Sequence, residues 1–188
     1  IIAADDMFST PIMAANEVIT DLELGMNFTF NNGYAKINGY KMLYLNEQLK
    51  NINLSQEGEY SYYSADSTTH SGFEYESKLY IDSKTILGIN GAIQMNVFNN
   101  GNFIPNTPSS MMNVSLSHDF SKNLLLFAHY RKIGGMYIDI INAEDGYINS
   151  FGVFDLGTNI SRGKFKVSLK INNVFNKLYS TYGYSYDY

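Results

Sequence analysis

The residue types most suited to binding a ligand gather in one polar stretch of the first half of the chain. Three phenol groups and an imidazole occur within eleven positions, at Tyr60, Tyr62, Tyr63 and His70. In an exposed loop, such side chains could hold an iron chelate or haem, because imidazole is a common metal ligand. In many loops, however, aromatic residues only fill the packing of the loop itself. The sequence therefore predicts a ligand contact here as a hypothesis, with loop packing as its alternative.

The remaining groups that could bind a metal are not spaced as metal ligands. His118 and His129 have no cysteine, histidine or carboxylate cluster around them at ligand spacing. The acidic residues Asp139, Glu144 and Asp145 do not follow the order of a calcium loop and fit a solvated turn better. We predict no metal site.

Two pairs of charged residues have the spacing of one strand face. Glu74 and Glu76 form one pair and Lys166 and Lys170 the other. Paired carboxylates can perform acid–base chemistry in a cleft. In a polar channel, however, they would meet water and protein. The sequence contains no phosphate loop, nucleophile elbow or dinucleotide motif. We expect no catalytic residue, no cofactor and no enzyme.

Composition narrows the class of protein further. The 188 residues include no cysteine, which excludes disulfides and thiolate zinc sites, and a net charge of −5 argues against a nucleic-acid surface. Only 16% of the residues are charged, while 15% are aromatic. No apolar run is long enough for a membrane-spanning helix, but a membrane β-barrel would escape this test because its apolar residues occupy every second position.

Strict alternation of apolar and polar residues predicts strands. From Asp21 to Phe30, five apolar residues alternate with five polar or small ones, a period that only a strand can use. The same criterion predicts eight strands and no helix. The expected strands are 21–30, 34–44, 73–82, 87–97, 112–116, 124–133, 154–160 and 165–175.

The connections between these strands alternate in length. Short turns are expected at 31–33, 83–85, 119–123 and 162–164. Long loops are expected at 45–71, 99–110, 134–151 and from 176 onward. Strands of about ten residues, sorted loops and aromatic residues near strand ends predict an all-β, antiparallel, up-and-down transmembrane β-barrel. A free-standing eight-stranded outer-membrane barrel, structural or adhesive, and a soluble β-sandwich that binds carbohydrate are the alternatives.

One segment near the end of the chain resembles a family signature. It resembles the carboxyl-terminal motif of TonB-dependent outer-membrane receptors. The signature residues are Asn172, Asn173, Val174, Phe175, Asn176, Lys177 and Tyr179. The spacing of Pro105 and Pro108 and the Gly-aliphatic-Glu-x-Glu pattern of 72–76 are similar to family elements and occur in family order, although Ser109 and Ser110 stand where the family has a basic residue.

This resemblance implies a particular organisation. Family barrels have 22 strands, so residues 1–188 would form about eight of them within one transmembrane barrel domain. The plug domain, which carries the contact with TonB, and the last strand are not present in this stretch. The implied function is uptake of a scarce nutrient, such as a ferric siderophore, haem or another metal chelate, across the outer membrane of a two-membrane bacterium. The implied partners are outer-membrane lipid, TonB and the ligand, and no nucleic acid.

Overall fold

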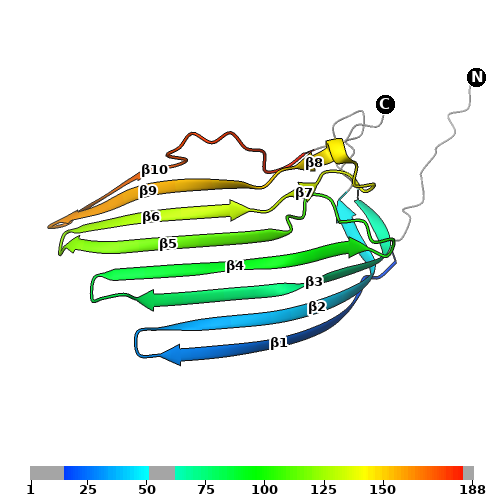
Figure 1. The fold of residues 1–188 in the computed structure, drawn as a ribbon, viewed down its shortest axis with the longest axis horizontal. Helices are drawn as coiled ribbons and strands as arrows, with labels where there is room; N and C mark the ends of the chain where they lie inside the picture. The colour runs from blue at the N-terminus through cyan, green and yellow to red at the C-terminus, as the bar shows by residue number, and fades with distance from the viewer. Residues whose placement is uncertain (1–14, 51–61, 184–188) are drawn as a thin grey trace, which may run out of the picture.

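The computed structural model describes residues 15–50 and 62–183, which form one antiparallel sheet of eight strands (Figure 1). In spatial order the strands are β1 (Val18–Phe30), β2 (Gly33–Lys50), β3 (Tyr62–Tyr80), β4 (Thr85–Phe98), β5 (Ser110–Ser121), β6 (Leu124–Ile133), β9 (Phe151–Arg162) and β10 (Phe165–Ile171). Two short strands, β7 (Met136–Tyr137) and β8 (Tyr147–Ile148), form a separate pair around the 3₁₀ turn η1 (Glu144–Gly146). Among these described residues, no helix is long and apolar enough to cross a membrane.

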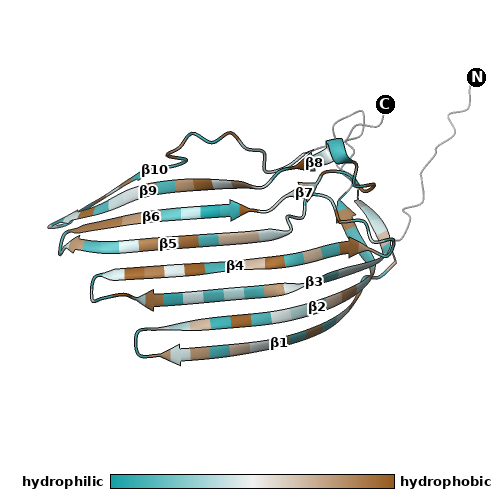
Figure 2. Ribbon diagram, in the orientation of Figure 1, coloured by the Kyte–Doolittle hydropathy of each residue, from teal (hydrophilic) through white to brown (hydrophobic). Residues whose placement is uncertain are grey.

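The sheet has one apolar and one polar face. Apolar and polar residues alternate along each strand, and the register pairs residues of the same kind on neighbouring strands. Leu24 lies opposite Gly39, Gly39 opposite Phe73, and Phe73 opposite Ile93, so these residues share what we call the apolar face. The polar face carries the residues between them. Its charged and amide members include Glu23, Lys36, Asn38, Glu74, Glu76, Asn90, Asn113, Arg131, Asp155 and Lys170. Figure 2 shows the alternation along the strands.

Large apolar side chains of the apolar face are exposed. Leu24 is 80% exposed and Ile93 is 61% exposed. The buried hydrophobic residues of the described ranges are few, and most of them lie near the loop-bearing ends of the strands. They are Ala65, Ala92, Ile104, Met136, Phe151 and Val153. A sheet that leaves its apolar face open over this area needs an apolar surrounding.

The sorting of connections predicted from the sequence is confirmed. The turns at 31–32, 81–84, 122–123 and 163–164 lie at one end of the sheet, which we call the turn end, and the longer connections lie at the opposite loop end (Figure 1). Two residues join β1 to β2 and β9 to β10. Gly163 has φ of 60°, as tight hairpins often require of their first turn residue.

Several expected boundaries were wrong. The strands expected at 112–116 and 154–160 are longer, Ser110–Ser121 and Phe151–Arg162, and two further differences concern the connections. The loop expected over 45–71 is instead largely strand, since β2 continues to Lys50 and β3 begins at Tyr62. The last strand ends at Ile171 and not at 175. In the first case β2 and β3 extend together, pairing Leu45 with Ser67 and Lys50 with Tyr62. Where water lies on both faces of a strand, apolar and polar residues need not alternate. The strand is then not recognisable from the sequence, although its backbone hydrogen bonds continue.

The alternative folds are also excluded by the sheet. A closed eight-stranded barrel would pair β1 with β10, but within the described residues these are the two edges of an open sheet. A sandwich would require a second large sheet, and the described residues add only the β7–β8 pair. The open sheet matches the partial barrel that the resemblance implies.

Candidate functional site

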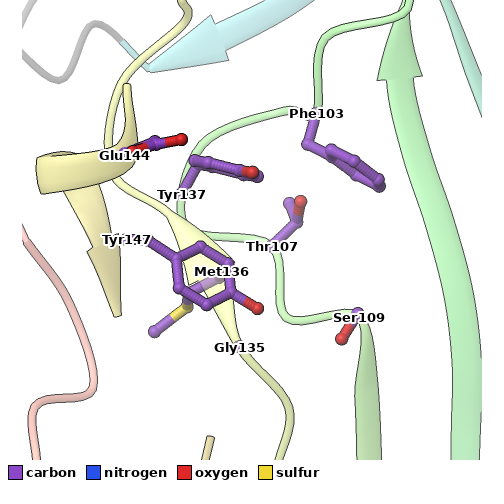
Figure 3. A pocket seen from close by; sticks show the side chains of 8 residues that line it. All are labelled: Phe103, Thr107, Ser109, Gly135, Met136, Tyr137, Glu144 and Tyr147. Atoms are coloured by element: carbon purple, nitrogen blue, oxygen red, sulfur yellow. The ribbon is translucent and has the colours of Figure 1, made fainter. Parts of the chain in front are cut away.

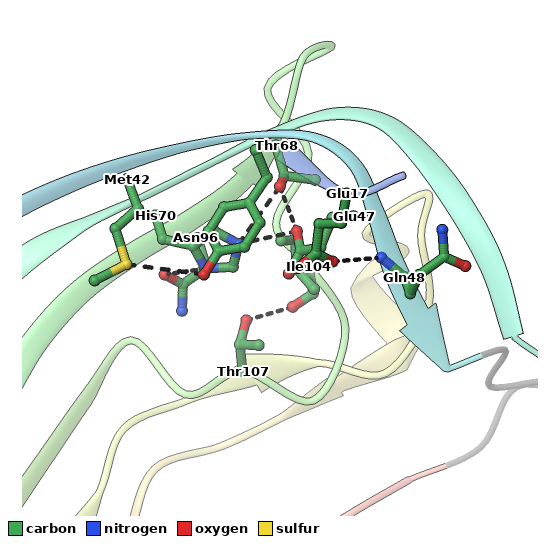
Figure 4. A network of polar contacts seen from close by, with 10 residues as sticks. Glu17, Met42, Glu47, Gln48, Thr68, His70, Asn96, Ile104 and Thr107 are labelled. Carbon is green, nitrogen blue, oxygen red and sulfur yellow. Dashed lines mark hydrogen bonds and ion pairs between the residues drawn. The ribbon is translucent and has the colours of Figure 1, made fainter. Parts of the chain in front are cut away.

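A hydrogen-bonded network occupies the polar face near the loop end (Figure 4). The Nε2 atom of His70 lies 3.0 Å from Glu47 Oε2, and its Nδ1 atom lies 3.1 Å from Asn96 Oδ1. The hydroxyl of Thr68 donates to the same Glu47 carboxylate, and Thr68 is only 1% exposed. Both ring nitrogens of His70 therefore have protein partners.

A change of face in β2 brings Glu47 into this network. Simple alternation would place Glu47 on the same face as Leu45, which is the apolar one. Asn46 has φ of 57°, a left-handed conformation that interrupts the pleat. The Glu47 carboxylate consequently reaches Thr68 and His70 on the polar face. Asparagine adopts this conformation more readily than most residues, which explains its use at this position.

The loops 99–109 and 134–150 are joined by asparagine side chains that imitate backbone pairing. Asn142 Oδ1 accepts a hydrogen bond from the Phe103 amide at 2.6 Å, and Asn142 Nδ2 donates to Phe103 O at 3.0 Å. Asn102 Nδ2 donates to Ile140 O at 2.9 Å. A third segment is held in the same way, because Asn106 exchanges two hydrogen bonds with the backbone of Gly183. Three connections of the loop end thus form one bonded unit.

This unit contains a pocket of about 330 Å³ (Figure 3). Its lining is mainly aromatic and apolar, with hydroxyls and one carboxylate. The lining residues are Phe103, Thr107, Ser109, Gly135, Met136, Tyr137, Glu144 and Tyr147. The rings of Phe103 and Tyr137 are stacked with centroids 5.9 Å apart, and Tyr147 meets Tyr137 edge-on at 4.9 Å. Such a pocket suits a flat or apolar group that also offers hydrogen bonds.

The pocket and the His70 network share one loop. The amide of Ile104 donates to Asn96 O at 2.9 Å, and Asn96 itself contacts His70. Thr107 lines the pocket and its hydroxyl donates to Ile104 O. Residues 104–107 therefore connect the pocket to the polar face through hydrogen bonds.

Three of the four ligand residues predicted from the sequence lie in one strand, β3. His70 and Tyr63 lie in β3, so their expected placement in a loop was wrong, although both lie toward the loop end. Tyr62 is the first residue of β3, and Tyr60 lies outside the described residues. His70 faces the Glu47 network and contacts the ring of Tyr44 edge-on at 5.0 Å.

The signature segment folds back along β9. The amide of Asn173 donates to Asp155 Oδ1 at 2.9 Å, and that of Val174 donates to Phe154 O at 2.8 Å. Asn173 also closes its own turn, since its side chain accepts from the Lys177 amide and donates to Lys177 O. Phe175 stacks on Phe154 and Tyr179 stacks on Phe151. Asn172 precedes this turn, and Asn176, with φ of 49°, continues it.

Sequence reasoning missed several residues of the site. Asp155 is 2% exposed and lies 3.1 Å from Lys170 Nζ and 3.6 Å from Arg131 Nη2. An isolated acid between apolar neighbours in β9 was its only sequence signal. Glu47 had none, because the turn of face at Asn46 cannot be seen in the alternation. The described residues contain no cluster of three or more groups that could hold a metal ion.

The chain matches the family described as TonB dependent receptor-like, beta-barrel, over residues 4–174. No curated protein sequence matches it significantly.

Several solved structures share its fold. The ferric yersiniabactin uptake receptor FyuA from Yersinia pestis is 20% identical, with a TM-score of 0.75 over 90% of this chain and 26% of that one. The copper transporter OprC is 16% identical, with a TM-score of 0.72 over 90% and 26%. The siderophore receptor PiuA from Acinetobacter baumannii is 18% identical, with a TM-score of 0.71 over 88% and 25%.

At these identities the likeness concerns the fold, and the chain spans about a quarter of the length of each structure. The family match covers most of the chain and agrees with the open sheet, its two faces and its sorted loops. The chain belongs to the TonB-dependent receptor-like β-barrel family.

Proposed function

We propose that this chain is part of the barrel wall of an outer-membrane receptor that imports a scarce nutrient with the help of TonB. The observation that carries the proposal is the division of the sheet into an exposed apolar face and a hydrogen-bonded polar face, with all long connections at one end. The apolar face would meet lipid, the polar face would line the lumen, and the loop end would face the outside.

The rest of the receptor would complete the barrel. The unpaired edges of β1 and β10 support neighbours on both sides, because an open edge inside a membrane leaves backbone groups without partners. A plug domain would fill the lumen and contact TonB, as the family implies. The charged residues of the polar face, such as Glu74 and Glu76, would meet that plug and water.

The ligand would bind at the loop end. Support comes from the aromatic pocket, from its connection to the His70 network, and from Tyr62, Tyr63 and His70 of the predicted group, which lie in β3 toward the same end. Tyr60 belongs to the same prediction from the sequence. A ferric siderophore, haem or another metal chelate fits an aromatic pocket with hydroxyls around it. The solved structures of like fold include siderophore receptors and a copper transporter.

The test is uptake by the full-length receptor in its native bacterium. Deletion of the gene should abolish uptake of at least one radiolabelled iron or haem source under iron limitation, and the receptor should be recovered in the outer membrane only with detergent. A receptor that is soluble in plain buffer, or uptake that is unchanged for every chelate supplied, would contradict the proposal.

Two variants test the predicted ligand residues. Tyr63→Ala and His70→Ala should raise the ligand concentration for half-maximal uptake about fivefold or more, because each removes a contact worth about 1 kcal/mol or more. His118→Ala is the matched control, since His118 lies near the turn end, where it contacts Thr85. If all three variants behave alike, the ligand does not contact Tyr63 or His70.

A further inference from the structure

The apolar face is not uniformly filled, because a groove of about 590 Å³ crosses β1 to β4. Exposed apolar side chains form its walls, among them Leu22, Leu24, Phe73 and Met95. One charged residue, Lys41, lines it as well. A groove with this mostly apolar lining suits a hydrocarbon chain.

Gly39 lines this groove, with the ring of Phe73 packed against it. It lies between Leu24 and Phe73 in the register, where neighbouring strands present large side chains. A Cβ atom at Gly39 would lie 3.2 Å from Cε1 of Phe73, so the Phe73 ring already leans over the glycine. A larger side chain at 39 would have to displace the Phe73 ring and would therefore change the shape of the groove, on the face of the sheet away from the polar one.

Lys41 is exposed and makes no hydrogen bond or ion pair with any residue that the structure describes. It lies opposite Leu22 on one side and opposite Ser71 on the other. Glu47, which the register alone would put on the apolar face, turns to the polar face at Asn46. The charged residues that the registers place on the apolar face of the described strands are Lys41, Lys132 and Arg162, all of them basic.

The height of Lys41 matches a lipid headgroup. It lies eight residues beyond Gly33, the first residue of β2. With the usual rise and tilt of barrel strands, this places it about 20 Å above the turn end, near the upper edge of an apolar band about 25 Å tall. A lysine at this depth extends its ammonium toward the headgroups while its stem stays among apolar atoms.

We propose that the groove over Gly39 is a binding site for a phosphate-bearing lipid of the outer leaflet, whose acyl chain lies between Leu24 and Phe73 and whose phosphate meets Lys41 and the Ser71 hydroxyl. The inference rests on the proposed membrane location and adds a specific lipid site to it. Charge complementarity identifies the occupant, since an unpaired cation at the top of a hydrocarbon groove favours an anionic amphiphile.

Lys132 supplies the matched control. It also faces outward and lies eight residues beyond the first residue of its strand, Leu124. Its partners across the sheet are Met112 and Gly152, so it lies well away from the groove, about 19 Å along the sheet from Lys41. General attraction of headgroups to lysines at this depth would affect both residues, whereas a specific site affects Lys41 alone.

The experiment measures lipid binding to the full-length receptor, extracted in detergent and stripped of native lipid, by native mass spectrometry. The probes are bis-phosphorylated lipid A and the same lipid without phosphates. The wild-type receptor should prefer the phosphorylated form about fivefold, as expected for one lysine at the surface of a bilayer. Lys41→Gln should remove this preference, Lys132→Gln should keep it, and Gly39→Val should weaken binding of both lipids.

If Lys41→Gln and Lys132→Gln reduced the preference for the phosphorylated lipid equally, lipid phosphates would be attracted to any lysine at this depth, and the specific site would be contradicted. Displacement of the lipid by millimolar inorganic phosphate would overturn it in favour of a simple anion site. A receptor that imports its ligand from the outer membrane and shows no lipid preference would contradict this inference alone, whereas a water-soluble receptor would contradict the proposed function as well.

Discussion

At the scale of single residues, Asp155 shows how a buried carboxylate can be stabilised on the polar face. Its carboxylate is almost fully covered, but it accepts the Asn173 amide and lies beside Lys170 and Arg131, whose side chains are about half exposed. The two cations reach water while they neutralise the acid, so neither they nor the acid bear the full cost of burial. The same carboxylate anchors the signature segment to β9.

Replacing Asp155 by alanine is expected to destabilise the receptor by about 2–3 kcal/mol, because a buried acceptor and the counter-charge of two cations are lost together. Thermal unfolding of the full-length receptor in detergent measures the effect. The control is Lys36→Ala, which breaks an exposed ion pair with Glu76 at 3.6 Å and should cost less than 1 kcal/mol. Equal costs for the two variants would show that Asp155 is not an anchor.

Asp82 should make stability depend on pH at the turn end. Its carboxylate accepts the Lys84 amide at 2.7 Å, and this bond, with that from the Thr85 hydroxyl, lowers the pKa of Asp82 below its ordinary value of 3.8. A lowered pKa gives a stabilisation that is present above the unfolded-state pKa and lost as the pH falls through the folded one.

Asp82→Ala should therefore lower the unfolding temperature at pH 6, and the difference from wild type should shrink as the pH is lowered below 3.8, the ordinary pKa of the group. Asp119→Ala is the control, because within the described residues the Asp119 side chain accepts no hydrogen bond. A pH-independent difference for Asp82→Ala would mean that its effect is steric.

At the scale of elements, the sequence predicted strands wherever two different environments imposed alternation. Residues such as Leu22 and Leu24 revealed β1 because lipid-facing and lumen-facing positions must differ. The upper parts of β2 and β3 were missed because polar residues such as Ser64 and Ser67 suit either face there. Glu47 could not be placed on the polar face, since that depends on one φ angle at Asn46. Pairings between distant loops, such as Asn142 with Phe103, leave no periodic signal at all.

The joined loops should loosen when the Asn142 side chain is removed. Asn142→Gly keeps the left-handed φ of 57° without strain but loses three hydrogen bonds, to the Phe103 amide, Phe103 O and Asp139 O. A loss of about 2 kcal/mol would speed amide exchange at Phe103 about thirtyfold, provided that exchange there occurs by local opening. Hydrogen exchange measured by mass spectrometry on the full-length receptor gives the rate.

The control for this prediction is Asn176→Gly. Asn176 also has a positive φ, of 49°, but its side chain makes no hydrogen bond with the described residues. It should leave exchange at Phe103 unchanged. Unchanged exchange in Asn142→Gly itself would mean that the pocket loops are held by their other contacts, which are the aromatic stacking and the backbone bonds of Asn106 and Ser109 to Tyr137 and Gly135, and not by the Asn142 side chain.

At the scale of the whole molecule, charge is distributed according to face. The acids Glu23, Glu74 and Glu76 lie on the polar face of β1 to β3, and the bases Arg131 and Lys170 lie on the polar face of β6 to β10. In the described strands, the charged residues that the registers place on the apolar face are Lys41, Lys132 and Arg162, all cations. A soluble protein has no reason for this arrangement, since its solvent-facing side would be the one with the most charge. A wall between lipid and a water-filled lumen requires it.

The proposal that one face meets lipid and the other meets water can be tested with two variants. Each places one charge in the middle of a strand, on one of the two faces. Leu116 lies in the middle of β5 on the apolar face, opposite Leu87 and Ala128, and the adjacent Ser115 faces the polar side opposite Gly88 and His129. Leu116→Arg should destabilise a membrane barrel by about 2–4 kcal/mol and reduce the amount assembled in the outer membrane, because the arginine would enter the middle of the hydrocarbon layer. Ser115→Arg should cost little, because the lumen is wet. If both variants assemble and unfold like wild type, the exposed apolar face does not contact lipid, and the barrel-wall proposal fails.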